Sequence, residues 1–348
     1  MAALAVAIGS IAVAAAASSA PRLPAVGPDQ LVASVLRALA SDPTIEGHVS
    51  AHVDLGLPDV VSGTLTQQGG PIPSLLGDHR LRVWRSPDGL RLTEQLAMGE
   101  RSVYVNRVDS SAWLWDWNSF TAYRAGPLPP PQDGSGEDNA PPLPDPLSMA
   151  RMALRAIDPT TAVSVASTER VAGRAAYTLV LEPRTSATLV GRVEIAIDAG
   201  RRLPLRVAVF ARGSDVARIS AGFTTVGFGP IDPSTFRFHP PTSAKVEPLR
   251  DLLRQGVGTA GLADLGEYAG GPVDVRTFGA GWASIAAVRL PKDLLDAAAT
   301  SGDAGLLSLL PFSGNLFSIR LVQRGDHGWV VYGAVPQSAL AGVEGRLP

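Results

Sequence analysis

Residues 177–223 read YTLVLEPRTSATLVGRVEIAIDAGRRLPLRVAVFARGSDVARISAGF. Within this stretch, apolar side chains take every second position in four short runs: Tyr177-Leu179-Leu181, Val193-Ile195-Ile197, Leu205-Val207-Val209 and Ile219-Ala221-Phe223. A period of two is typical of strands with one buried face, and turn residues such as Asp198-Ala199-Gly200 separate the runs. The stretch therefore predicts four consecutive antiparallel strands.

Shorter alternating runs lie nearer the N-terminus, at residues 49–53, 81–84, 103–105 and 113–117. Apolar residues instead follow helical spacing at 28–40 and 146–157, and a short helix is expected at about 248–255. Helices confined to one side of a long antiparallel meander predict an α+β fold rather than a parallel βαβ sheet.

The chain has 348 residues, which is enough for about two domains. We expect a first domain at 21–255, a Gly-rich linker at 256–271 and a smaller α+β domain at 272–348. Strands are predicted in the small domain around 282–290, 317–323 and 329–335, with a leucine-rich segment at 305–310. Residues 126–146 contain eight prolines and four acidic residues, so they predict an exposed loop, or alternatively a Pro-rich ligand for a partner domain.

The composition excludes several classes of protein. Thirty Lys and Arg against 32 Asp and Glu give a net charge of -2, so no basic face for nucleic acid is implied. The chain has no cysteine, which excludes disulfides, Cys-ligated metals and a thiol nucleophile.

An apolar, alanine-rich run occupies residues 2–17, and the small residues 18–20 follow it. This pattern is typical of a signal peptide, although no Lys or Arg precedes the run. Cleavage after Ala17 fits better than cleavage just before Pro21. The run is slightly short for a spanning helix, which needs about 20 apolar residues. We therefore expect an exported, extracytoplasmic protein with residues 1–20 as signal peptide or N-terminal anchor; a buried Ala-rich helix is the alternative.

Common catalytic and cofactor motifs are absent from the sequence. Gly256–Gly261 matches G-x-G-x-x-G, but a polar helix end precedes it where a dinucleotide site needs a buried strand. His48 and His52 point to the same face of a strand and, with Asp54, could form a metal edge; exposed surface histidines are the simpler interpretation. We expect no enzyme, cofactor or metal site. A hydrolase with an unrecognised site is the remaining alternative.

The tryptophans Trp113, Trp115 and Trp117 alternate, so they are expected to share one face of a single strand. Three interpretations stay open: core packed beneath a helix, the wall of an apolar cavity, or an exposed contact patch for another protein. The alternation predicts ten candidate cavity residues: Leu81, Val83, Tyr104, Trp113, Trp115, Tyr177, Leu179, Val207, Val209 and Phe223. A register error of one residue would move a strand's side chains to the other face.

The segment Ala112–Trp117, followed by a turn and an aromatic strand, resembles the LW-x-YD hairpin of the LolA-type periplasmic lipoprotein-carrier family, with Trp115 at the tyrosine position. The family's central strands are similar to Val171-x-Gly173-x-x-x-Tyr177-x-Leu179-x-Leu181-x-Pro183, Ile195-x-Ile197-Asp198 and Pro204-Leu205-Arg206-Val207. Phe236-x-Phe238-x-Pro240-Pro241 with Val246 resembles the motif that closes the LolA-like sheet, where Ser243 replaces a usual glycine.

The C-terminal unit resembles the small second domain of RseB/MucB, regulators of an envelope-stress sigma factor. The similar segments are Gly281–Ile285 and Val331–Pro336 with Leu340, while Ala334 replaces the usual acidic residue.

These resemblances imply a curved antiparallel sheet that forms an incomplete barrel covered by helices. They also imply a non-enzymatic, exported binding protein that holds an acyl chain, a lipid or a lipidated protein between sheet and helices. A regulator that binds an anti-sigma factor or another membrane protein is the alternative. The helices at 28–40 and 146–157 would form the movable cover.

Overall fold

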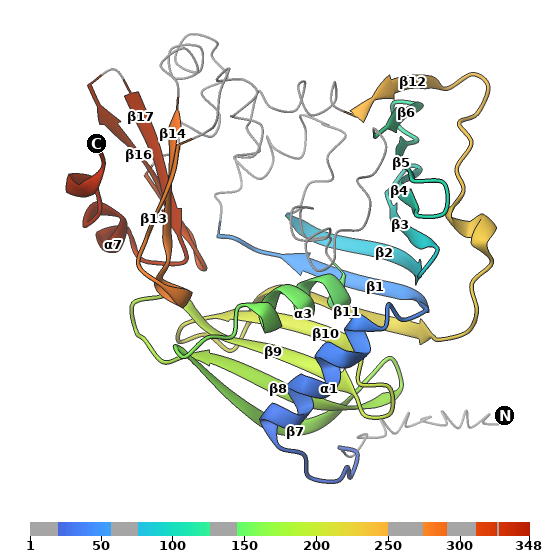
Figure 1. Ribbon diagram of the computed structural model, residues 1–348, viewed down its shortest axis with the longest axis horizontal. Helices are drawn as coiled ribbons and strands as arrows, with labels where there is room; N and C mark the ends of the chain where they lie inside the picture. The colour runs from blue at the N-terminus through green and yellow to red at the C-terminus, as the bar shows by residue number, and fades with distance from the viewer. Residues whose placement is uncertain (1–19, 57–75, 126–144, 250–273, 291–310, 326) are drawn as a thin grey trace, which may run out of the picture.

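The computed structural model describes residues 20–56, 76–125, 145–249, 274–290, 311–325 and 327–348 (Figure 1). The N-terminal apolar run at 2–17, the linker at 256–271 and the leucine-rich segment at 305–310 lie outside these ranges. So do most of the Pro-rich loop and of the helix expected at about 248–255. The expected domain boundaries therefore stay predictions.

A sheet of twelve strands dominates the described residues, in the order β12-β6-β5-β4-β3-β2-β1-β11-β10-β9-β8-β7. Its strands are β1 Ile45–Val53, β2 Gly77–Ser86, β3 Gly89–Gln95, β4 Glu100–Asn106, β5 Ser111–Asp116, β6 Thr121–Arg124, β7 Thr161–Val171, β8 Arg174–Pro183, β9 Val190–Asp198, β10 Pro204–Ala211, β11 Ala217–Gly227 and β12 Lys245–Pro248. Neighbours pair antiparallel except β12 and β6, which are parallel. The two end strands, β12 and β7, do not pair with each other, so the sheet stays open.

Two helices, α1 (Pro28–Ala40) and α3 (Pro146–Arg155), cover one face of the half of the sheet formed by β7–β11. Figure 1 shows the sheet curving from β7 past β1 to β6, with both helices on its concave side. Each helix has proline in its first turn, where the missing N–H has no intrahelical partner to lose. Asp145 caps α3 by accepting hydrogen bonds from the backbone nitrogens of Leu147 (2.9 Å) and Ser148 (3.1 Å). The predicted α+β fold with a curved, open antiparallel sheet is confirmed.

A second sheet of five strands has the order β13-β14-β17-β16-β15. Its strands are β13 Val275–Phe278, β14 Ile285–Leu290, β15 Phe312–Ser313, β16 Ser318–Arg324 and β17 His327–Gly333. The short helix α7 (Gln337–Ala341) packs on it through Leu340, against the buried Trp329 and Val331. The predicted strands of the small C-terminal unit therefore form, within one residue or a few of the expected positions.

The C-terminal unit contacts the large sheet at the loop between β8 and β9 and at the start of β7. The carbonyl oxygen of Ala334 accepts hydrogen bonds from the Leu189 nitrogen (2.8 Å) and from the Thr188 hydroxyl (2.7 Å). The Trp282 indole nitrogen donates to the Thr161 hydroxyl at 2.8 Å. Leu316 joins the core of the large sheet, so the two sheets share an apolar contact as well as these bonds.

The turn between β9 and β10 depends on a buried carboxylate, Asp198. Its Oδ1 accepts hydrogen bonds from the backbone nitrogens of Gly200 and Arg201, and its Oδ2 pairs with the Arg174 guanidinium. Burial raises the pKa of Asp198, but the bonds from Arg174 and the backbone outweigh it, so the pKa lies below its usual range. The carboxylate therefore stabilises the fold only while it is ionised.

We predict that Asp198→Asn lowers the free energy of unfolding by about 1–2 kcal/mol at pH 7, because the Arg174 guanidinium then faces a neutral amide in place of a carboxylate. Since the folded pKa lies below the unfolded value of about 3.9, this contribution is full above that value and disappears as the pH falls through the folded pKa. Urea unfolding of the variant and the parent between pH 7 and pH 2.5 measures the difference. Asp215→Asn, at a fully exposed carboxylate, is the control. A difference between Asp198→Asn and the parent that stays constant with pH would contradict this role.

Candidate functional site

The register of the strands divides the ten predicted cavity residues between the two faces of the large sheet. Val49 of β1 pairs with Leu81 of β2 and with Phe223 of β11, which places all three side chains on the face that carries the helices. Along the pairing, seven predicted residues share that face: Leu81, Val83, Tyr177, Leu179, Val207, Val209 and Phe223. The remaining three, Tyr104, Trp113 and Trp115, lie on the opposite, convex face.

The concave face under the helices is filled by side chains. Leu31, Val35 and Leu39 of α1 and Leu147, Ala150 and Leu154 of α3 belong to the same apolar core as the residues of β8–β11. Leu179 and Ile195 of the sheet and Leu31 and Val35 of the helix have no accessible surface. A side chain without accessible surface borders no space large enough for a water molecule. In this conformation, therefore, the interface between helices and sheet is closed.

Few polar contacts hold α1 on the sheet. The segment that leads into it is tethered by the Thr168 hydroxyl, which donates to the Pro21 carbonyl at 2.6 Å, and by the Tyr177 hydroxyl, which donates to the Pro24 carbonyl at 3.0 Å. Arg151 of α3 donates to the Leu39 carbonyl at the end of α1 at 3.3 Å. The remaining attachment that the described residues show is the apolar core.

A row of buried charged side chains crosses the same face on β2–β5. His79 Nδ1 lies 2.7 Å from Glu94 Oε1, and the Arg101 guanidinium lies 3.9 Å from Glu94 and 3.1 Å from Asp116. Asp116 also accepts from the backbone nitrogen of Asn118 at 2.8 Å. The Arg101 guanidinium thus lies between two carboxylates, as a buried charge requires, and the His79 ring is hydrogen-bonded to one of them. They border the apolar strip that contains Leu81, Val83 and Leu92.

The sequence gives no local signal for this row. Its four members lie on four different strands, and only the register of each hairpin brings them opposite one another.

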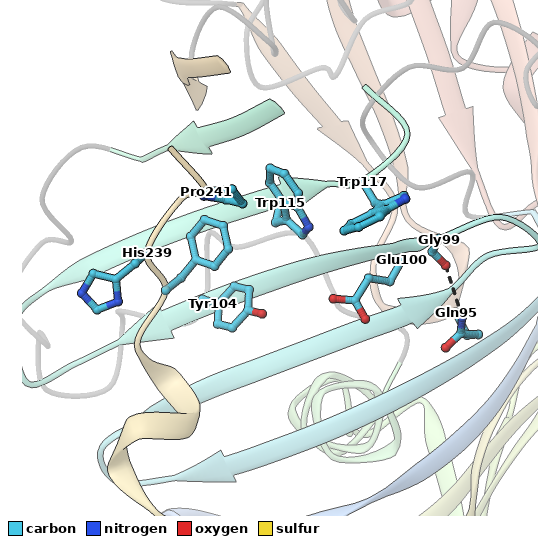
Figure 2. Close-up of a pocket in the computed structure, with 9 residues that line it drawn as sticks. Gln95, Gly99, Glu100, Tyr104, Trp115, Trp117, His239 and Pro241 are labelled. Carbon is cyan, nitrogen blue, oxygen red and sulfur yellow. Dashed lines mark hydrogen bonds between the residues drawn. The ribbon is translucent and has the colours of Figure 1, made fainter. Parts of the chain in front are cut away.

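An aromatic pocket of about 400 Å³ lies on the convex face (Figure 2). It is lined by Gln95, Gly99, Glu100, Tyr104, Trp115, Trp117, Phe238, His239 and Pro241. The segment around Phe238 crosses β4 and β5 and covers the tryptophan strand: the Phe238 ring stacks on Tyr104 with centroids 4.8 Å apart and lies 5.8 Å from Trp113 and from Trp115. The tryptophans thus pack beneath an extended segment and not beneath a helix.

Burial raises the pKa of Tyr104, the negative charge of Glu100 adds to that effect, and Arg91 opposes it. The Tyr104 phenol is therefore neutral at any physiological pH. Within the pocket lining, only Tyr104 and Trp115 were predicted as site residues from the sequence. The Phe236-x-Phe238 motif signalled an aromatic pair, but not the face on which it packs.

His48 and His52 lie on the convex face with partners of their own. His48 Nδ1 is 2.9 Å from the Thr225 hydroxyl, and His52 Nδ1 is 2.8 Å from Asp78. Within the described ranges, no group of three or more His, Asp or Glu side chains is placed to hold a metal ion. No helix in the described part of the chain is long and apolar enough to cross a membrane.

Comparison with solved structures finds several matches over most of the chain. MucB and LolA-superfamily proteins are among them. MucB in complex with MucA(peri) matches with a TM-score of 0.47 at 14% identity, covering 91% of this chain and 97% of that one. The Pseudomonas aeruginosa MucA/MucB complex gives 0.42 at 14% identity, covering 90% and 96%. A LolA-superfamily protein from Nitrosomonas europaea gives 0.25 at 8% identity, covering 62% and 99%. No family model matches the sequence, and no curated protein does. MucB and the LolA superfamily are the two groups that the sequence motifs resemble.

We predict that Thr168→Val, which removes the tether to Pro21, loosens α1 without unfolding the sheet. The lost hydrogen bond contributes about 1 kcal/mol, so amide hydrogen exchange should rise several-fold in α1 and stay unchanged in β9 and β10. Hydrogen-exchange mass spectrometry measures this difference.

Thr224→Val is the matched control, because its hydroxyl donates to the His48 carbonyl at 3.3 Å, away from the helices. Equal exchange of α1 in the two variants would show that the tether does not restrain the helix.

Proposed function

We propose that the chain is an exported, non-enzymatic binding protein that holds an acyl chain, a lipid or a lipidated protein between the concave face of its sheet and helices α1 and α3. The observation that carries this proposal is the nature of that interface: two short helices are attached to a broad apolar sheet face almost entirely through aliphatic side chains. Aliphatic contacts of this kind can also be made with an apolar ligand that enters between the helices and the sheet.

The burial energy of an acyl chain is of the same order as the burial energy of the helix side chains on the sheet. A sixteen-carbon acyl chain offers about 12 kcal/mol of gross burial energy at about 0.8 kcal/mol per methylene. The helices contribute six large buried side chains at about 2 kcal/mol each, Leu31, Val35, Leu39, Leu147, Met149 and Leu154, and the smaller Ala150. A ligand that enters between the helices and the sheet can therefore contact both apolar faces, and the helices can close on the sheet again when it leaves.

The path of an acyl chain follows from the residues on the sheet. The apolar face continues beyond the helices through Phe223 and Val49 to Leu81 and Val83. The charged row that begins at His79 and Glu94 borders it on β2 and β3. We infer that the chain lies along Val207, Phe223 and Leu81 and that a polar headgroup would be placed near the charged row.

The extracytoplasmic location in this proposal rests on the alanine-rich run at residues 2–17, which suits an export signal or an N-terminal anchor. An export segment would bring the protein to the compartment where lipidated proteins and membrane receptors are exposed.

A second candidate function is the binding of a membrane protein, such as an anti-sigma factor, by the small sheet. One observation favours it: β13 lies at the end of that sheet among the described strands, and Val275, Arg276 and Thr277 on it are exposed. An exposed edge strand can accept a strand from a partner by backbone hydrogen bonding.

The proposal predicts that the protein purified from an exporting host carries an acyl species in about 1:1 ratio, or takes one up from added phospholipid or lipoprotein. Native mass spectrometry followed by organic extraction measures this. Val209→Arg should lower the occupancy several-fold, because Val209 is a half-buried residue of the apolar face and an arginine there can reach solvent while its charge repels the acyl chain.

Ser220→Arg is the matched control: Ser220 is equally half-buried, on the neighbouring strand β11, and on the convex face. Equal lipid content in the two variants would contradict the assignment of the concave face. A clean apo mass with no uptake by the parent protein would contradict lipid binding and favour the partner protein at β13.

A further inference from the structure

The pocket on the convex face combines aromatic rings with a single carboxylate (Figure 2). The Trp115 and Trp117 indoles stand at 84° to each other with centroids 6.4 Å apart, so they form two walls of a corner. Figure 2 shows Glu100 directed toward Tyr104, beneath the two indoles. Glu100 is the only residue of the lining that is negatively charged, and the lining has no Lys or Arg.

No positively charged side chain in the described part of the chain pairs with Glu100. Among the described side chains, the Ser102 hydroxyl donates to Glu100 Oε1 at 3.4 Å. The Arg91 guanidinium instead stacks on the Tyr104 ring, 4.8 Å from its centroid, and on Trp84. The carboxylate thus faces the aromatic pocket with its charge uncompensated by a salt bridge within the described residues.

Neighbouring residues hold the Trp117 indole, which forms the exposed wall of this pocket, in a fixed position. Trp117 is 53% exposed, yet it is held against Phe120 (6.0 Å between centroids) and against Gly99. Gly99 has a φ of +100°, and a Cβ there would lie only 2.8 Å from Trp117 Cγ, so the indole can lie against the turn only because this residue is glycine. An exposed tryptophan that is positioned in this way is typical of a binding site.

We propose that this pocket binds a quaternary ammonium cation of the choline type. Aromatic ring faces attract a cation through their quadrupole, most strongly when the cation carries little hydration. A trimethylammonium group needs no hydrogen-bond acceptors and contacts the rings through its methyl groups, while Glu100 supplies the opposite charge. A primary ammonium or a guanidinium would need several acceptors converging on its N–H groups, whereas most of the lining is aromatic or apolar, with Glu100 as its one carboxylate. The free cation and the headgroup of a lipid present the same chemistry to this pocket.

The test is a titration of the full protein with choline, followed by tryptophan fluorescence and by isothermal calorimetry. We expect saturable binding, at least tenfold tighter than that of 3,3-dimethylbutan-1-ol, which has the same shape without the charge, and tighter than that of ethanolamine. Trp117→Ala and Glu100→Gln should each weaken choline binding at least fivefold, and Gly99→Ala should weaken it by moving the indole. Val246→Ala and Glu182→Gln, at exposed positions outside the pocket, should bind like the parent.

Equal affinity for choline and its neutral analogue, or for choline and ethanolamine, would overturn the proposal. So would unchanged binding in both Trp117→Ala and Glu100→Gln. If phosphatidylcholine vesicles compete with choline and phosphatidylglycerol vesicles do not, the bound cation is a lipid headgroup. If neither vesicle competes, the ligand is the free cation. The inference does not depend on the acyl site, and Val209→Arg should leave choline binding unchanged.

Discussion

The pairing of β1 with β11 is the interaction on which the architecture depends. It joins the N-terminal meander β1–β6 to the C-terminal meander β7–β11, so that two hairpin stacks become one curved sheet with continuous faces. Gly47 makes this pairing possible, because a Cβ there would collide with the Thr225 carbonyl oxygen and lie 2.9 Å from the Phe223 ring. The register shifts directly after it, between His48 and Val49, and an irregularity of this kind bends a sheet.

The two continuous faces of the large sheet differ in their chemistry. The concave face is aliphatic beneath α1 and α3 and ends in a paired charged row on β2–β5, whereas the convex face collects the aromatic side chains of β4 and β5 under the segment around Phe238. The aliphatic face suits an apolar ligand that enters beneath the helices. The aromatic face suits a small cation that takes a place already open. The two proposals therefore use opposite sides of one sheet and can be tested separately.

The sequence predicts much of this fold, because helical and strand periods are local properties. Both helices and the strands around Tyr177, Val193, Leu205 and Ile219 lie where alternation and caps place them. β7 is not predicted, because its sequence, TAVSVASTERV, is largely polar at the open edge of the sheet. β12 is not predicted either, because it is short and pairs in parallel with a strand far away in sequence. Alternation correctly puts Trp113 and Trp115 on one face of their strand. Whether that face is the same as the face of Tyr177 depends on the register of seven intervening strands, and no local sequence pattern specifies that register.

In the proposed complex an acyl chain lies between the concave face and the helices, which move outward to admit it. The most direct test is a crystal structure of the protein with a brominated acyl ligand, in which anomalous scattering locates the bromine. The account predicts bromine density beside Leu179 and Val207, with α1 and α3 moved from the sheet. Density confined to the pocket beside Trp117, with both helices in place, would contradict it.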